Sequence, residues 1–316
     1  MNPEILGEDW LKVQGAVKDA LGTDVGILAR TNERILSHGG KMLRPMCSLL
    51  VAKALGKPGK DSIRFAAASE LLHNATLLHD DVADKSDTRR GNPTVCSLLG
   101  ARNAVLVGDF WLSRAVGCVT SSRRRDKVVG IFTKTLSDLA EGEMLQLEKS
   151  MTLDTTEEDY FRIIYCKTAS LFEAACVAGA LSVDAPEEKV EAARKYAVAM
   201  GLAFQIKDDI LDYEGTGELG KPVGEDIREK KITLPLLGAA KNAGKDVRKL
   251  MRSADVCPWK ALKFRRFVRT GGGVQYASEV LEKYVEQACE ALKAFPEGPE
   301  RDCLEQIARF NSIRKK

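Results

Sequence analysis

Long apolar stretches, paired cysteines and strand-like alternation are all missing from this sequence. Its uncharged runs reach at most about eleven residues, roughly half of the length that a membrane-spanning helix needs, which argues against an integral membrane enzyme. The segment 1–10 carries acidic side chains and has no apolar stretch flanked by basic residues, so no secretory signal is predicted. The eight cysteines are scattered, without a CxxC pair, which favours reduced thiols in a cytoplasmic protein.

A strong excess of either charge is also missing. The 48 basic and 45 acidic residues leave a net charge of +3, which excludes nucleic-acid binding driven by bulk charge. What the chain does contain is 316 residues with 44% hydrophobic and 29% charged side chains, an ordinary composition that can bury a large core.

Helix-forming residues with apolar positions three and four apart dominate the whole chain, whereas β-branched residues never cluster for long. Glycine- and proline-containing segments interrupt this pattern and predict helix ends. No linker or shift in composition divides the chain, so we expect one domain over residues 1–316, an all-α bundle of about ten to twelve helices. The expected helices span 8–21, 24–37, 43–55, 62–84, 94–119, 125–150, 157–183, 187–212, 231–243, 259–269, 273–294 and 298–313.

The most informative segment closes one of these helices with three aspartates. Asp80 and Asp84 lie four residues apart on one helical face, and Asp81 lies beside them. Carboxylates this close repel one another unless a cation neutralises them, and hard divalent ions such as Mg²⁺ prefer carboxylate oxygen. One such cluster alone is more often a solvated helix end than a metal site.

A second cluster with the same spacing, Asp208, Asp209 and Asp212, closes another mostly apolar helix. Aspartate is a poor helix former, so its repeated use at two apolar helix ends favours a functional interpretation. Facing each other, the two clusters would form one metal-filled mouth over an apolar interior.

Basic residues surround both clusters in the sequence. They are Lys41, Arg44, Arg89, Arg90, Lys167, Lys207, Lys221 and Lys231. Each alone is more often a surface residue. Together with acidic metal ligands they supply what diphosphate binding requires, because metal ions bridge the phosphoryl oxygens while cationic side chains offset the remaining charge.

Seven segments resemble the motifs of the trans-isoprenyl diphosphate synthases, also called polyprenyl synthetases, and occur in the order of that family. They are GGKMLRP (39–45), ELLHNATLLHDDVADKSDTRRG (70–91), VLVGDF (105–110), EGEMLQL (141–147), KTASLF (167–172), FQIKDDILD (204–212) and GKPVGEDIREKKITLP (220–235). The resemblance covers about residues 30–240, and the two ends of the chain match only in general helical character. It implies the isoprenoid synthase fold, a helical bundle around a deep central cavity.

The same resemblance implies a prenyltransferase that condenses an allylic diphosphate with isopentenyl diphosphate, head to tail, and releases diphosphate. By the family pattern, several Mg²⁺ ions are held on the allylic diphosphate by Asp80, Asp81, Asp84, Asp208, Asp209 and Asp212. The side chains similar to those that contact this diphosphate are Arg89, Lys167, Lys207, Lys221 and, as a further candidate, Lys231. Those that resemble the isopentenyl diphosphate site are Lys41, Arg44, His73 and Arg90. Thr168 and Gln205 resemble the polar groups near the developing allylic cation.

Product length is expected to depend on helix 62–84, along which the prenyl tail grows away from the metal site. A side chain five positions before Asp80 lies roughly 7–8 Å deeper, and the residues there, Ala75 and Thr76, are small. Short-chain members of the family typically carry aromatic residues at these positions. The resemblance therefore implies an open channel and a product of about C30 to C50, with octaprenyl diphosphate (C40), built on farnesyl diphosphate for a quinone side chain, as the central expectation. Phe132 and Leu136, one turn apart on helix 125–150, are the alternative floor.

Three alternatives stand beside this interpretation: a shorter-chain farnesyl or geranylgeranyl diphosphate synthase, a class I terpene cyclase, and a non-catalytic subunit that regulates a synthase. A cyclase usually replaces the second aspartate cluster and has no need for the cations of GGKMLRP. A regulatory subunit typically loses one aspartate cluster, whereas both are present here.

The resemblance also implies a homodimer, and the expected helices 94–119 and 125–150 are rich in apolar and small residues, as helices that bury more than one face are. We expect a cytoplasmic protein without a nucleic-acid partner. Its membrane contact is expected to be at most peripheral, for product release.

Overall fold

The computed structural model describes residues 3–214, 225–254 and 258–314. Apart from one antiparallel pair of two-residue strands, the regular structure in these residues is helical. The predicted all-α fold class is therefore confirmed.

The chain divides into two compact units. The first comprises Met1–Thr133, Ala174–Arg194 and Ala294–Leu304, and the second comprises Lys134–Glu173, Lys195–Lys293 and Glu305–Lys316. Four helices contain a division between the units, namely α7 (Arg125–Thr152), α9 (Ser170–Ser182), α10 (Glu187–Glu214) and α16 (Pro299–Ile313). The single domain expected from the sequence stays a prediction.

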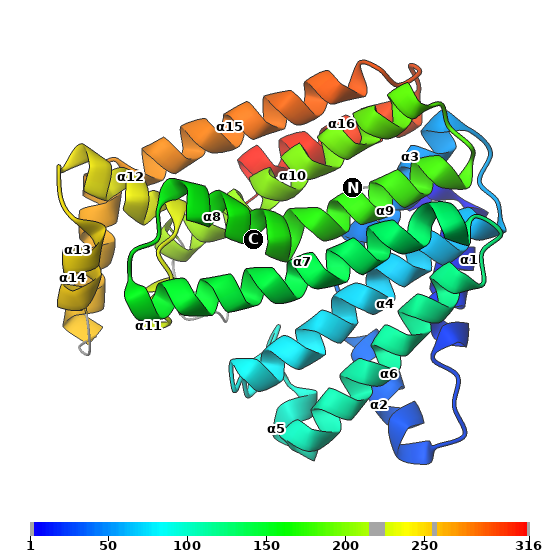
Figure 1. Ribbon diagram of the computed structural model, residues 1–316, viewed down its shortest axis with the longest axis horizontal. Coiled ribbons are helices and arrows are strands. Elements are labelled where there is room, and N and C mark those ends of the chain that lie inside the picture. The colour runs from blue at the N-terminus through cyan, green and yellow to red at the C-terminus, as the bar shows by residue number, and fades with distance from the viewer. Residues whose placement is uncertain (1–2, 215–224, 255–257, 315–316) are drawn as a thin grey trace. The chain divides into compact units, whose positions relative to one another are not determined.

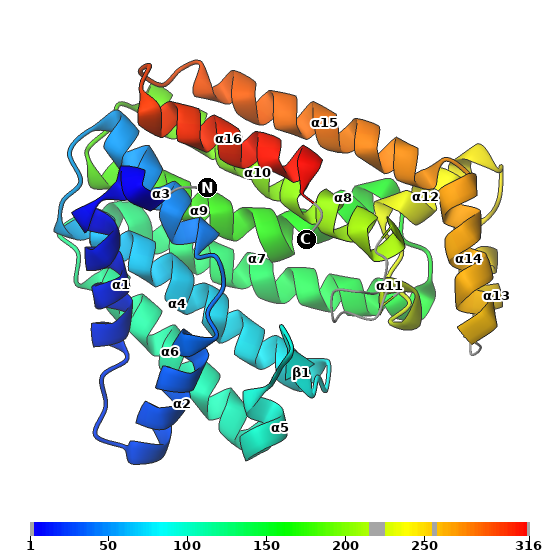
Figure 2. The same ribbon diagram turned by 180° about the vertical axis from the view of Figure 1, so that it is seen from behind.

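The first unit is built around α4 (Lys60–Ala83), which lies beside α6 (Ala101–Thr120) in the views from both sides (Figure 1 and Figure 2). Its other elements are a short 3₁₀ turn η1 (Pro3–Leu6), α1 (Glu8–Ala20), α2 (Gly26–Ser37), α3 (Leu43–Leu55) and α5 (Val95–Leu99). Trp111 of α6 is fully buried, and its Nε1 donates a hydrogen bond to Asn32 Oδ1 (2.9 Å). Asn32 in turn donates to the carbonyl of Leu21 (3.1 Å), so the end of α1, α2 and α6 are joined inside the core.

A small hairpin follows the end of α4 (Figure 2). Strand β1 (Thr88–Arg89) pairs with β2 (Asn92–Pro93), and the two residues of its turn, Arg90 and Gly91, both have positive φ angles of 52° and 76°, as a tight hairpin turn requires. Thr94 closes the hairpin, because its hydroxyl donates to the carbonyl of Ser86 (2.7 Å) and accepts from the first turn of α5.

The second unit contains the later part of α7, α8 (Glu157–Ile164), a π-helical turn η2 (Tyr165–Ala169) and most of α10. It continues with α11 (Glu225–Arg228), α12 (Leu234–Asn242), α13 (Val247–Ala254), α14 (Pro258–Thr270) and α15 (Gly273–Leu292). One buried cluster joins α10 to α12 and α15 through residues such as Ile206, Leu234 and Leu281. A second cluster joins α12 to α14 around Leu236 and Phe264.

One helical stretch among the described residues, Glu157–Ser182, is long and apolar enough to cross a membrane. Of its most apolar window, 83% is buried inside the protein. A buried core helix passes the same test of length and composition.

Most predicted helix limits lie within a few residues of the observed ones, and α3 matches the predicted range 43–55. The helix predicted over 94–119 is wrong in one respect, because α5 and α6 are separate helices divided at Gly100. Its φ of 81° cannot continue an α-helix. The long helix predicted over 157–183 contains the π-helical turn η2 between α8 and α9.

Candidate functional site

The first aspartate cluster lies at the end of α4 in the first unit. Asp81 is buried, with 5% of its surface exposed, and its Oδ1 accepts a hydrogen bond from Arg89 Nε of the hairpin (2.7 Å). Burial raises the pKa of Asp81, the Arg89 guanidinium opposes this shift, and the neighbouring Asp84 carboxylate adds to it. Asp80 is half-buried and Asp84, which caps the helix, is exposed.

Three arginines of the first unit are grouped around one histidine. The pKa of His73 is held well below its usual value, first by burial and then by the positive charges of Arg44, Arg90 and Arg89. His73 is therefore neutral at physiological pH and adds no charge to the group. This convergence of α3, α4 and the hairpin gathers several positive charges, which the buried carboxyl group of Glu70 beside Arg44 and Arg90 offsets in part. The remaining positive charge suits an anionic ligand.

The glycine loop of the GGKMLRP segment approaches the same group. A Cβ atom at Gly40 would lie 2.7 Å from Nη1 of Arg90, so only glycine allows the Arg90 guanidinium to lie against this backbone. Lys41 follows directly and is exposed. The structure thus brings Arg44, His73 and Arg90 together, as the sequence predicts for one substrate, and places Lys41 next to them along the chain.

The VLVGDF segment of α6 contacts α4 just before the cluster. His79 Nε2 lies 3.3 Å from Oδ1 of Asp109. A Cβ atom at Gly108 would lie 2.3 Å from the same nitrogen, so the imidazole packs directly on the α6 backbone.

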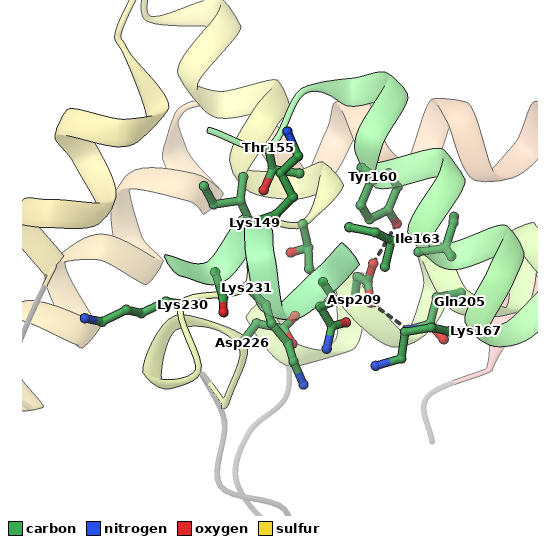
Figure 3. A pocket seen from close by; sticks show the side chains of 15 residues that line it. Lys149, Thr155, Tyr160, Ile163, Lys167, Gln205, Asp209, Asp226, Lys230 and Lys231 are labelled. Atoms are coloured by element: carbon green, nitrogen blue, oxygen red, sulfur yellow. Dashed lines mark hydrogen bonds between the residues drawn. The ribbon is translucent and has the colours of Figure 1, made fainter. Parts of the chain in front are cut away.

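Asp209 is the residue of the second cluster that lines a pocket of about 240 Å³ within the second unit (Figure 3), whereas Asp208 and Asp212 are not among its lining residues. Asp209 lies at this pocket with 5% of its surface exposed. Its Oδ2 accepts from the Tyr160 hydroxyl (2.6 Å) and its Oδ1 accepts from Gln205 Nε2 (2.9 Å). Gln205 Oε1 in turn accepts from the Thr168 hydroxyl (2.7 Å). A continuous chain of hydrogen bonds therefore connects the π-helical turn, α10 and α8.

The start of α8 explains where Tyr160 is placed. Thr156 caps this helix, because its hydroxyl accepts from the backbone N–H of Asp159 (3.1 Å), while the Asp159 carboxylate accepts from the backbone N–H of Thr156 (2.9 Å). This reciprocal pair is a capping box. It fixes the first turn of α8, from which Tyr160 reaches Asp209.

Negative charge is concentrated in the second cluster. Burial raises the pKa of Asp209 to about 7; its two hydrogen bonds oppose the shift, and the carboxylates of Asp208 and Asp212 add to it. The pKa of Asp226 lies well above its usual value, first because of burial and then because of the carboxylates of Asp209 and Asp212. Its Oδ2 atom is shut off from solvent without a hydrogen-bond partner. The cluster offers several buried carboxylate oxygens whose negative charge is only partly offset by neighbouring groups. It therefore fits a hard divalent cation such as Mg²⁺.

Within the part of the chain that the structure describes, no three side chains of His, Cys, Asp or Glu converge at metal-binding distance. Mg²⁺ usually keeps several waters and binds one or two carboxylates together with substrate phosphates. The donor set of each cluster therefore suits a cation that arrives with, or is completed by, a phosphate ligand.

The predicted lysines of the second unit have different surroundings. Lys167 and Lys231 line the pocket and form ion pairs with Glu143 and Glu229 respectively. Lys207 is half-buried, its pKa is lowered chiefly by burial, and it donates to a backbone carbonyl near the end of α16. The predicted Lys221 lies outside the described residues.

The residues predicted to control product length are all partly or fully buried. Ala75 is 1% exposed, and Phe132 is 6% exposed. Thr76 and Leu136 are half-buried, and the Thr76 hydroxyl donates to the carbonyl of His73 (2.8 Å). Their role in product length stays a prediction.

Three residues at these sites escaped the sequence reasoning. Asp226 stands in a segment that the resemblance includes, where an acidic residue before a lysine pair was the available signal. Tyr160 gives no signal, because a tyrosine at an apolar helical position looks like an ordinary core residue. Arg314, which contacts Asp208 (2.7 Å), belongs to a region outside every recognised motif.

Comparisons with known proteins identify the family of the chain. The family model described as polyprenyl synthetase matches residues 25–256. An octaprenyl diphosphate synthase of Escherichia coli (strain K12) is 37% identical over 311 residues, covering 97% of this chain and 96% of that protein. A short chain isoprenyl diphosphate synthase of Methanothermobacter thermautotrophicus is 36% identical over 90% of this chain and 89% of its own length.

Among solved structures, the polyprenyl synthase from Caulobacter crescentus CB15, complexed with calcium and isoprenyl diphosphate, superposes with a TM-score of 0.92. It is 36% identical and the match covers 99% of this chain and 97% of that chain. The protein belongs to the polyprenyl synthetase family and has its isoprenoid synthase fold. It is accordingly a prenyltransferase.

Proposed function

We propose that the protein is a Mg²⁺-dependent enzyme that joins an allylic diphosphate to successive isopentenyl diphosphates and makes a trans-polyprenyl diphosphate of about C30 to C50. Octaprenyl diphosphate (C40), built on farnesyl diphosphate for a quinone side chain, is the central proposal, in line with the name of the Escherichia coli relative. A shorter product is the second candidate, because a relative of nearly equal identity is named a short chain synthase. The proposed location is the cytoplasm, with at most peripheral membrane contact for product release.

The observation that carries this proposal is the arginine group around His73. This group lies in the same unit as the first aspartate cluster, yet Arg44 comes from the first turn of α3 and Arg90 from the hairpin turn, and neither comes from the acidic end of α4. An anion site beside a metal-type carboxylate cluster suits two diphosphates, one carried with the metal and one held by cations alone. A terpene cyclase, which binds one diphosphate, has no use for the second site.

Each group has a part in the proposed reaction. Bound Mg²⁺ supplies electrostatic stabilisation of the diphosphate leaving group as it accumulates charge. The two aspartate clusters hold the cations, while Arg44 and Arg90 hold isopentenyl diphosphate through charge-assisted hydrogen bonds. Thr168 and Gln205 place oxygen atoms near the developing allylic cation, and apolar walls keep water away from it.

The test of this function is an incorporation assay with the purified chain alone. Radiolabelled isopentenyl diphosphate is supplied with Mg²⁺ and, in parallel, with geranyl, farnesyl or geranylgeranyl diphosphate, and the dephosphorylated products are separated by chromatography. We expect a dominant product near C40. A dominant C15 or C20 product would favour the shorter-chain synthase, and no incorporation with any primer would favour a non-catalytic subunit.

Replacement of Lys41 by alanine is expected to raise the KM for isopentenyl diphosphate by about 10- to 100-fold, which corresponds to the loss of one charge-assisted hydrogen bond. The turnover number at saturating substrate should change far less, because this cation positions one substrate without assisting ionisation of the other. Arg44→Ala should behave in the same way. Lys57→Ala, an exposed lysine on the loop after α3, is the control. A fall in turnover with an unchanged KM would contradict this assignment.

We also propose that the protein is a homodimer. In the first unit α6 exposes Val105 and Val116, which are eleven residues apart and therefore on one helical face. In the second unit α7 exposes Met144, Leu147 and Met151 to 51–77%, again on one face. Apolar side chains grouped on a helical face are typical of a surface covered by another copy. Sedimentation velocity at micromolar concentration should give a dimer, and a monomer would remove the proposal.

A further inference from the structure

An ion pair and a hydrogen bond join the end of α16 to the part of α10 that carries the second aspartate cluster. Arg314, directly after the helix, is 7% exposed, and its Nη1 lies 2.7 Å from Oδ1 of Asp208. Two residues earlier, the backbone carbonyl of Ser312 accepts a hydrogen bond from Lys207 Nζ (3.3 Å). Two adjacent residues of the FQIKDDILD segment are therefore held by the end of a helix that lies outside every recognised motif.

The Arg314 guanidinium is placed by contacts that do not involve the carboxylate. Its Nη2 donates to the backbone carbonyl of Phe204 (2.7 Å), and its central carbon lies 4.3 Å from the centre of the Phe204 ring. The backbone N–H of Arg314 also continues the helical pattern by donating to the carbonyl of Phe310 (2.9 Å). A planar guanidinium held at its face and at one of its nitrogens keeps a fixed direction for the remaining donors.

Asp208 is the less rigid partner of this pair. Its side chain is 42% exposed, against 6% for that of Arg314, so the buried arginine orients the accessible carboxylate and not the reverse. With Oδ1 engaged by a fixed donor, Oδ2 is the oxygen left for another ligand. Groups that hold a metal-binding carboxylate through its second oxygen set its orientation, and their loss commonly weakens metal binding by about 10- to 100-fold.

We infer that Arg314 is a positioning residue, which orients the Asp208 carboxylate for the divalent cation and makes the end of α16 a part of the metal site. This inference rests on the proposed metal-binding role of Asp208. It assigns to Arg314 no contact with substrate.

Three variants test the inference. Arg314→Met keeps most of the side-chain volume but removes the charge and all donors, and Arg314→Lys keeps the charge but loses the planar fork. Arg309→Met is the matched control, because Arg309 lies on the same helix and its Nε donates to Glu305 of that helix (2.8 Å). Circular dichroism and thermal unfolding in EDTA establish that each variant is folded.

Two measurements are made on the full chain. The first is the Mg²⁺ concentration for half-maximal turnover, together with the turnover number at saturating Mg²⁺. The second is direct binding of Mn²⁺ in the presence of inorganic diphosphate, followed by electron paramagnetic resonance without any turnover. For Arg314→Met we expect both half-saturation concentrations to rise about tenfold or more and the turnover number at saturating metal to stay near the parent value. Arg314→Lys should be intermediate and Arg309→Met unchanged.

An unchanged or lower metal requirement in Arg314→Met would overturn the inference, as would a loss of turnover at every Mg²⁺ concentration with parent-like Mn²⁺ binding. If Arg314→Met does not fold, Arg314→Lys decides alone, and parent-like metal binding in that variant overturns the inference. Asp208→Asn separates the two proposals. Weak metal binding in Asp208→Asn with normal binding in the Arg314 variants removes only the role of Arg314, whereas normal binding in Asp208→Asn removes the metal-binding role of Asp208 and the inference with it.

Discussion

Asp80→Ala and Asp208→Ala are each expected to lower turnover by on the order of 10²–10³-fold or more, the usual cost of removing one group that stabilises charge in a transition state. The physical reason is that each carboxylate is proposed to hold a cation on the diphosphate leaving group, and without the cation the negative charge of that group is not stabilised. Steady-state kinetics at saturating Mg²⁺, with farnesyl diphosphate as primer, measures the effect.

Controls for this prediction follow from the surroundings of each residue. Asp87→Ala removes an exposed aspartate just beyond the first cluster and should leave turnover unchanged. Asp208→Ala leaves the buried Arg314 without its carboxylate, which costs stability, so Asp208→Asn is compared with it and the helical circular dichroism of all variants is recorded. Turnover close to the parent value in folded Asp80→Ala or Asp208→Ala would defeat the metal-binding assignment.

Ala75→Phe is expected to shorten the product substantially, from about C40 to a chain of farnesyl or geranylgeranyl length. The reason is geometric: a phenyl ring on α4 five residues before Asp80 would stand roughly 7–8 Å from the cluster along the helix and would close the proposed channel to a longer tail. Chromatography of the dephosphorylated products measures the shift, and the total incorporation should fall less than the length.

Phe132→Leu is the companion to this variant, because Phe132 on α7 is the alternative floor and is 6% exposed. If α4 sets the length, this conservative change should leave the product length unaltered. An unchanged product in Ala75→Phe together with a longer product in Phe132→Leu would show that the tail follows the α7 wall. Since Ala75 is only 1% exposed, thermal unfolding must accompany the assay to detect overpacking.

The helical architecture was predictable because the apolar period and the glycine and proline interruptions act locally. The limits of α3 at residues 43 and 55 follow from this pattern alone. The break at Gly100 was missed, because a single glycine inside a helical pattern is often tolerated and does not by itself indicate the positive φ of 81° that ends the helix here. The π-helical turn η2 has no recognised sequence signal, because its residues continue the helical pattern of the segments on either side.

The candidate site was predictable where one short segment carries its chemistry, as at Asp80 and Asp84. It was not predictable where residues far apart in the sequence come into contact. Nothing in the hairpin sequence shows that Arg90 lies against Gly40, and nothing in the last helix shows that Arg314 reaches Asp208. Such contacts arise from tertiary packing, which a local pattern does not encode.

The chain of hydrogen bonds from Thr168 through Gln205 to Asp209 has a direction, and the direction has a consequence. The hydroxyl proton of Thr168 is committed to Gln205 Oε1, and the Gln205 amide is oriented by its donation to Asp209. Towards any other neighbour, Thr168 therefore presents only oxygen lone pairs, the negative end of its bond dipole. The Asp209 carboxylate, acting through the Gln205 amide, therefore sets the orientation of the Thr168 hydroxyl, and a carbocation placed beside Thr168 would face the lone pairs of that oxygen and not its proton.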